Sequence, residues 1–247
     1  PRPLNIRMEF PMKRLVLPLI LLAAPTHAAT FTPPTGCTAY LTVQSRGCLV
    51  SQFYTCEADA KGEQWRADYD ADGPYFLSKI DHDAQWLESY DIYPGTKEVM
   101  EPNPRDPASF SDLLALGLDT FDFTLNKDNG EHTTIRGFDR LTGETATIDG
   151  VTLKQTEYEY TQTDEKGTVL RHSKGFEFIS EDWRTFFSGH SDWELEDGTW
   201  APSDTPPVKF ITAGKPGFAS TIPLFECDGQ MSSLSLPHSV AKSLGGS

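Results

Sequence analysis

The stretch Thr120–Phe138 reads TFDFTLNKDNGEHTTIRGF and holds two runs of aromatic and β-branched residues on either side of NKDNG. In the first run, Phe121, Phe123 and Leu125 alternate with Asp122 and Thr124. Alternation of this kind is typical of a strand with one buried and one wet face. The Asp-Asn-Gly turn supplies residues that tolerate positive φ, so the stretch predicts an antiparallel β-hairpin.

The same pattern recurs along most of the chain, from Tyr40 to Phe218. Short apolar and β-branched runs are separated by turn signals, which are SRG, DAKGE, DADGP, YPG, LTGE, DG, DEKG and EDG. Consecutive strands joined by such turns form a meander. We therefore expect a mainly β fold: a single antiparallel meander sheet curved into a half-open barrel, within one domain spanning residues 29–231.

One segment, RDPASFSDLLALGLD, breaks the strand pattern and predicts a short helix over residues 106–116. Asp106 is positioned to cap the free amides, Pro107 suits the first helical position, and Gly117 suits the end. Its apolar stripe is formed by Phe110, Leu113 and Leu114.

Residues 1–28 have the features of an export signal. Lys13 and Arg14 precede the apolar run LVLPLILLAA, and small residues follow, so we expect cleavage after Ala28 and Met12 as the natural start. The apolar run is shorter than the roughly 18 residues of a membrane helix, and we expect no membrane span. The polar segment 232–247 is expected to be disordered.

Acidic residues dominate the composition, with 36 Asp and Glu against 21 Lys and Arg, a net charge of −15. Removing residues 1–28 takes away four basic residues and one acidic residue, leaving 17 against 35, or −18. This charge excludes binding to nucleic acid and disfavours anionic membrane surfaces. We expect a periplasmic or secreted monomer without a cofactor or metal.

Four cysteines in an exported chain predict two disulfides. A tight turn centred on Arg46-Gly47 would place residues whose numbers sum to 93 opposite each other, which pairs Cys37 with Cys56. Cys48 would then join Cys227. A different turn would instead pair Cys37 with Cys48 and Cys56 with Cys227. The spacing lacks the CxxC knuckles of a zinc site.

The segment DYDADG, from Asp68 to Gly73, matches the first half of a calcium loop. The twelfth position of that loop requires a bidentate Glu, but it is Lys79 here. We therefore interpret the segment as a hairpin turn. The remaining calcium hypothesis requires Asp81 or Asp83 to complete the shell.

Signals for catalysis are sparse. No GxSxG, SxxK, P-loop or GxGxxG motif is present, and His82, between Asp81 and Asp83, would point away from both in a strand. A carboxylate-dependent hydrolase acting on envelope polysaccharide is an alternative function. Its candidate residues are Glu177, Glu181 and Asp182.

Aromatic residues are abundant for a sheet covered by one helix. A self-filled core is one explanation, and a cavity that binds a ligand is the other. For the second, we expect an apolar or amphipathic ligand. The charge of −18 favours a neutral or zwitterionic one, because an anionic headgroup would have to stay in solvent or meet local cations such as Arg136 and Arg140. The expected contacts are Trp86, Phe121, Phe123, Phe176 and Phe178.

The order of signal, aromatic meander, mid-chain helix and further meander, with the segment WLESYDIYPGTKEVM, resembles the LolA-type periplasmic lipoprotein carriers. The runs RGFDRLTGETATIDGV and EDWRTFFSG also resemble uncharacterised exported proteins of alphaproteobacteria. The first resemblance implies a lipid or lipoprotein partner and a role in envelope maintenance. A purely structural interaction module is a further alternative.

Overall fold

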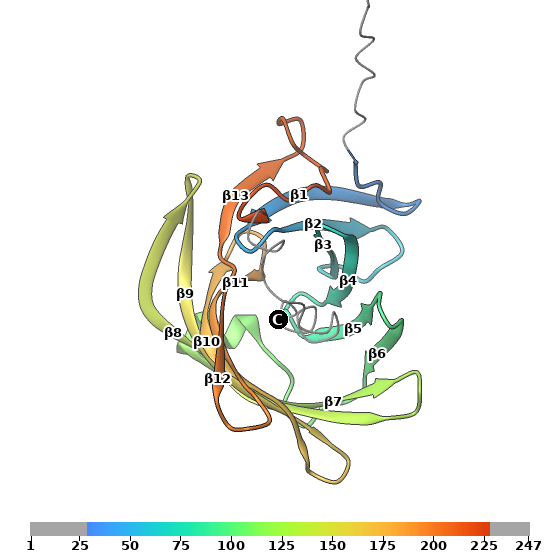
Figure 1. Ribbon diagram of the computed structural model, residues 1–247, viewed down its shortest axis with the longest axis vertical. Coiled ribbons are helices and arrows are strands. Elements are labelled where there is room, and N and C mark those ends of the chain that lie inside the picture. Colours follow the sequence, from blue (N-terminus) through green and yellow to red (C-terminus); the bar gives the residue numbers. More distant parts are fainter. Residues whose placement is uncertain (1–28, 228–247) are drawn as a thin grey trace, which may run out of the picture.

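The computed structural model describes residues 29–227, which form one antiparallel sheet of 13 strands and one short helix (Figure 1). The elements are β1 (Cys37–Ser45), β2 (Leu49–Cys56), β3 (Gln64–Asp70), β4 (Gly73–Ile80), β5 (Trp86–Asp91), β6 (Thr96–Met100), α1 (Phe110–Leu116), β7 (Leu118–Lys127), β8 (His132–Ile148), β9 (Val151–Asp164), β10 (Val169–Ser180), β11 (Thr185–Glu194), β12 (Trp200–Asp204) and β13 (Pro207–Thr212).

From β1 to β12, strands that follow one another in sequence are neighbours in the sheet. The last strand departs from this order, because β13 pairs with β1 at the opposite edge from β12. The predicted meander is confirmed, and the return of β13 is the feature that the turn signals did not predict.

The sheet curls on itself without closing into a barrel, and its two ends overlap (Figure 1). The ring of Phe187 on β11 lies 5.8 Å from that of Phe53 on β2 and 5.1 Å from that of Phe210 on β13. Leu153 of β9 is fully buried in the same cluster. Where the ends overlap, β9 to β11 are therefore covered on a face that a single-layered sheet would leave wet.

Helix α1 is shorter than the predicted 106–116 and has a different cap. The Ser109 hydroxyl accepts the Asp112 amide, so Ser109 is the N-cap and the prediction of Asp106 was wrong. Asp106 instead forms an isolated bridge with Asp122 of β7. Gly117 ends the helix in the left-handed conformation, as predicted.

The turn predicted at LTGE was wrong, because these residues lie within strand β8. The runs HTTIRGF and ETATID belong to one 17-residue strand, and LTGE is an irregularity in its pairing with β9, between Leu141 and Thr145. Gly143 has φ +84° there, which a bulge accommodates as readily as a turn does.

Three glycines inside strands mark close approach between neighbours: Gly137 of β8, Gly175 of β10 and Gly189 of β11. A Cβ atom at each would lie 2.2 to 2.3 Å from a carbonyl oxygen of the adjacent strand. Only glycine fits such a contact, and glycine inside a strand commonly marks a bend. These positions allow the tight coiling of β8 to β11.

The first hairpin contains the disulfide Cys37–Cys56, and a second disulfide joins Cys48 to Cys227. These are the disulfides of the first predicted pairing. The register of the hairpin next to its turn, however, differs from the predicted one. Next to the turn, Ser45 pairs with Leu49, so opposed residue numbers sum to 94. An irregularity between Ala39 and Leu41 restores the sum of 93 at the cysteines.

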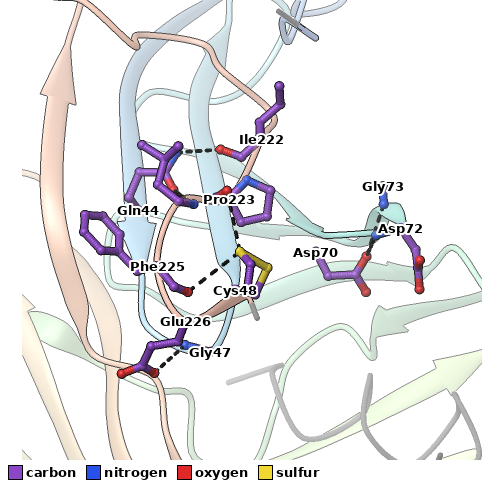
Figure 2. The surroundings of a disulfide bond; sticks show 12 residues. Gln44, Gly47, Cys48, Asp70, Asp72, Gly73, Ile222, Pro223, Phe225 and Glu226 are labelled. Atoms are coloured by element: carbon purple, nitrogen blue, oxygen red, sulfur yellow. Dashed lines mark hydrogen bonds between the residues drawn. A yellow bond between two sulfur atoms is a disulfide. The ribbon is translucent and has the colours of Figure 1, made fainter. Parts of the chain in front are cut away.

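The segment 219–227, here called the C-terminal strap, packs over β1 and β2 (Figure 2). Gln44, which is fully buried, donates to the Ile222 carbonyl and accepts the Leu224 amide, each at 3.0 Å. The Cys48 amide donates to the Phe225 carbonyl at 2.8 Å. Polar side chains on this face of β1 and β2 therefore bind a segment from the other end of the chain.

Two sequence predictions fall outside the described residues: the export signal at 1–28 and the tail at 232–247. Within residues 29–227, no helix is long and apolar enough to cross a membrane.

Candidate binding cavity

The curled sheet encloses a cavity of about 460 Å³. Its lining comes from strands β2 to β11 and from α1, so residues far apart in the sequence share one wall. The central apolar lining consists of Trp86, Phe121, Phe123, Ile135, Tyr158 and Tyr160.

Aromatic rings form a continuous wall in this lining. The Trp86 ring lies 5.6 Å from Phe123 and 6.3 Å from Tyr160, with edge-to-face geometry in both pairs. Tyr158 and Tyr160 follow on β9, with their rings 6.2 Å apart. Edge-to-face packing of this kind holds aromatic side chains in defined orientations.

Three of the five predicted contact residues, Trp86, Phe121 and Phe123, line the cavity. Phe176 and Phe178, the other two, are not among the residues that line it. Side chains alternate along β10, and Glu177 takes the position that faces the cavity. Phe178 packs in the overlap cluster, while Phe176 is 42% exposed.

The cavity has a solvent end and a closed end. Leu170, which lines it at the start of β10, is 52% exposed, and Asp91 at the end of β5, which also lines it, is exposed. At the other end, Phe110 of α1 is 1% exposed and Ala84 is 5% exposed. The helix therefore covers the closed end.

Charges near the solvent end are balanced. Lys127 lies 4.0 Å from Glu98. Burial raises the pKa of Glu98, and Lys127 and Arg171 oppose this rise. The surrounding lining partly desolvates the Asp91 carboxyl and raises its pKa, and Arg171 and Lys127 again oppose this rise. Two cations here accompany two carboxylates.

Near the closed end, carboxylates lie close together without neighbouring cations among the described residues to balance their charge. Asp119 of β7 and Asp139 of β8 are register partners. Asp139 is also the register partner of Tyr158 on β9. Opposed residues of an antiparallel pair have Cβ atoms about 5 Å apart. Glu177 lines the same cavity from β10. Three acidic side chains therefore meet at one end of an aromatic wall.

The pKa values of these carboxyls reflect their surroundings. Burial raises the pKa of Asp119 to about 6, although the Ser109 amide that it accepts at 2.9 Å opposes the rise. Burial, and then the negative charges of Glu177 and Asp119, raise the pKa of Asp139 well above its usual range. Within residues 29–227, neither Asp119 nor Asp139 has a salt bridge.

The three residues of the hydrolase hypothesis are not brought together. Glu177 is 6% exposed and faces the cavity. Glu181 and Asp182 are exposed in the turn between β10 and β11, where Glu181 pairs with Lys154. The carboxylates that accompany Glu177 are instead Asp119 and Asp139, which no motif in the sequence marks.

The DYDADG segment is the predicted hairpin turn between β3 and β4. The Asp70 carboxylate accepts the amides of Asp72 and Gly73 at 2.8 and 3.1 Å (Figure 2). Asp68 is buried and pairs with Arg66 at 3.0 Å. The described part of the chain brings no three His, Cys, Asp or Glu side chains together as a metal site.

The acidic residues around His82 have separate roles. Asp81 accepts the amides of Asp83 and Gln85, at 2.8 and 3.0 Å, and Asp83 pairs with Arg184 at 2.8 Å. Arg136 and Arg140, the cations expected near a ligand, bind Asp122 and Glu157 and do not line the cavity. The cations in the lining are Arg66, Lys79, Lys127 and Arg171.

Comparisons with known proteins assign no family. No family model matches the chain, and no curated protein matches it. A solved structure from Bacteroides fragilis, described as that of an exported protein with a YmcC-like fold, is similar with a TM-score of 0.41 and 9% identity. The similarity covers 75% of this chain and 100% of that one. The resemblance to LolA-type carriers stays a prediction.

Proposed function

We propose that this protein binds one apolar or amphipathic small molecule inside its curled sheet. The observation that carries the proposal is the aromatic-lined cavity of about 460 Å³. Ligand sites typically have volumes of about 300–1,000 Å³ and combine apolar walls with a few polar groups. The cavity has both properties, and its size favours a compact ligand or a single chain over a whole lipoprotein.

The two disulfides support action outside the cytoplasm, because such bonds persist in oxidising compartments. Binding without chemistry is the simplest role for the site. Its walls are buried aromatic rings, and two of the three proposed hydrolase carboxylates lie in an exposed turn. The proposed role is therefore that of an extracytoplasmic carrier or sensor of a small amphipathic molecule.

The test uses the neutral dye N-phenyl-1-naphthylamine, whose fluorescence rises in apolar surroundings. Ser78 lines the cavity between its register partners Arg66 and Ser89, which also line it. Ser78→Phe should occupy the cavity without removing an existing apolar contact. We expect saturable binding by the wild type and at least a tenfold weaker affinity in this variant.

Leu77→Phe is the matched control, because Leu77 is the preceding residue of β4 and does not line the cavity. It should bind the dye as the wild type does. The proposal fails if the folded wild type shows no saturable binding, or if Ser78→Phe binds as tightly as Leu77→Phe.

A further inference from the structure

The chemistry of the closed end narrows the ligand class. Asp119 and Asp139 face one another across β7 and β8 and line the cavity without a basic partner among the described residues. Asp68, which is also buried, shows the contrast, because Arg66 lies 3.0 Å from it. An ionised carboxylate away from water is costly unless it is paired with a cation.

The lining between the two ends also holds a buried hydroxyl, that of Tyr160. Tyr160 is 4% exposed and lines the cavity, and its hydroxyl makes no hydrogen bond with the described residues. Arg171 is a charged neighbour of this hydroxyl and opposes the rise in the Tyr160 pKa that burial causes. A buried hydroxyl without a partner is uncommon in folded proteins.

The position of Tyr160 connects it to the carboxylates. It is two residues from Tyr158 on β9, and Tyr158 is the register partner of Asp139. Residues two apart on a strand lie on the same face, roughly 7 Å from each other. Gly137 lies opposite Tyr160 on β8, at a point where the two strands approach closely.

The surrounding rings suit a positive charge. Trp86, Tyr158 and Tyr160 belong to the lining, and the faces of aromatic rings attract cations. A metal ion fits poorly, because the described residues present no group of three His, Cys, Asp or Glu side chains arranged to hold one. An organic cation can pair with the carboxylates and also contact the faces of the aromatic rings.

Building on the proposed function, we infer that the ligand is a protonated amine attached to an apolar group. The ammonium lies at Asp119 and Asp139 and donates hydrogen bonds to their carboxylates, with the Tyr160 hydroxyl as a further acceptor. The apolar group extends along Trp86 and Phe123 toward the solvent end. Charge at the site is then neutralised by the ligand, as Lys127 and Arg171 neutralise the solvent end.

The experiment compares three probes that share one chain: decylamine, decanol and decanoate, each used to displace N-phenyl-1-naphthylamine at pH 7.5. We expect decylamine to bind at least tenfold more tightly than decanol, and decanoate to bind most weakly. Asp139→Asn should remove most of the preference for decylamine over decanol while dye binding persists.

Asp122→Asn is the control, because it removes the same charge from a residue that pairs with Arg136 and does not line the cavity. It should keep the wild-type preference. Equal binding of decylamine and decanol by the wild type, or an undiminished preference in Asp139→Asn, would overturn the inference and leave the proposed function intact. Absence of dye binding would instead remove the proposed function.

Discussion

At the scale of single residues, the closed end of the cavity combines acidic side chains with burial. Asp119 is 8% exposed, and its pKa of about 6 exceeds the ordinary value of 3.8 chiefly because burial disfavours the charged form. The folded state thus binds a proton more tightly than the unfolded state does. Between about pH 4 and pH 6, the unfolded chain releases this proton first, so the free energy of unfolding falls as pH rises.

Asp119→Asn should abolish this decrease in the free energy of unfolding. The amide keeps an oxygen for the Ser109 amide and carries no charge. We expect the variant to be more stable than the wild type by about 1–3 kcal/mol at pH 7.5, with no gain at pH 4. Urea unfolding at both pH values measures the difference. A constant offset, or a gain confined to pH 4, would show that Asp119 is not titrated in this way.

At the scale of elements, local chemistry predicted the hairpins well and the faces of strands less well. The turn at Asp70–Gly73 and the helix end at Gly117 depend on neighbouring residues, so the sequence determines them. Alternation along β10 identifies two faces, but it does not say which one meets a cavity. Because the sheet overlaps itself, Phe178 is partly buried on the face opposite Glu177.

The bend in β8 gives a prediction at this scale. Gly137→Ala would bring a Cβ atom to 2.3 Å from the Glu159 carbonyl oxygen, which requires the strands to separate. We expect a destabilisation of about 3 kcal/mol or more, measured by urea unfolding. Gly143→Ala on the same strand meets nothing within 4 Å and should cost only about 1 kcal/mol for its positive φ. Equal costs would refute the close-approach explanation.

At the scale of the whole molecule, the strap and its disulfide connect the two ends of the described chain. Cys48–Cys227 belongs to one of the two pairings that the sequence left open, but nothing in the sequence marked Gln44 and Gln52 as binding partners of the strap. Glutamines in a strand ordinarily indicate a wet face. Here both are fully buried, because segment 219–227 supplies the carbonyl groups that they require.

The two disulfides should differ in their contribution to stability. Cys48–Cys227 joins residues 179 apart, and Cys37–Cys56 joins residues 19 apart. In the chain-entropy model, the longer loop stabilises by about 2 kcal/mol more. The double variant Cys48→Ser/Cys227→Ser should therefore unfold at lower urea concentration than Cys37→Ser/Cys56→Ser. The reverse order would show that local packing at the first hairpin outweighs loop entropy.

The long disulfide also has a consequence for biogenesis. In a chain exported with its N-terminus first, Cys37, Cys48 and Cys56 reach the oxidising side while Cys227 is still to come. An oxidase that joins cysteines in order of arrival would link Cys37 to Cys48, which is not the native pairing. That bond must then be exchanged by thiolate attack. The yield of native protein should therefore depend on a disulfide isomerase.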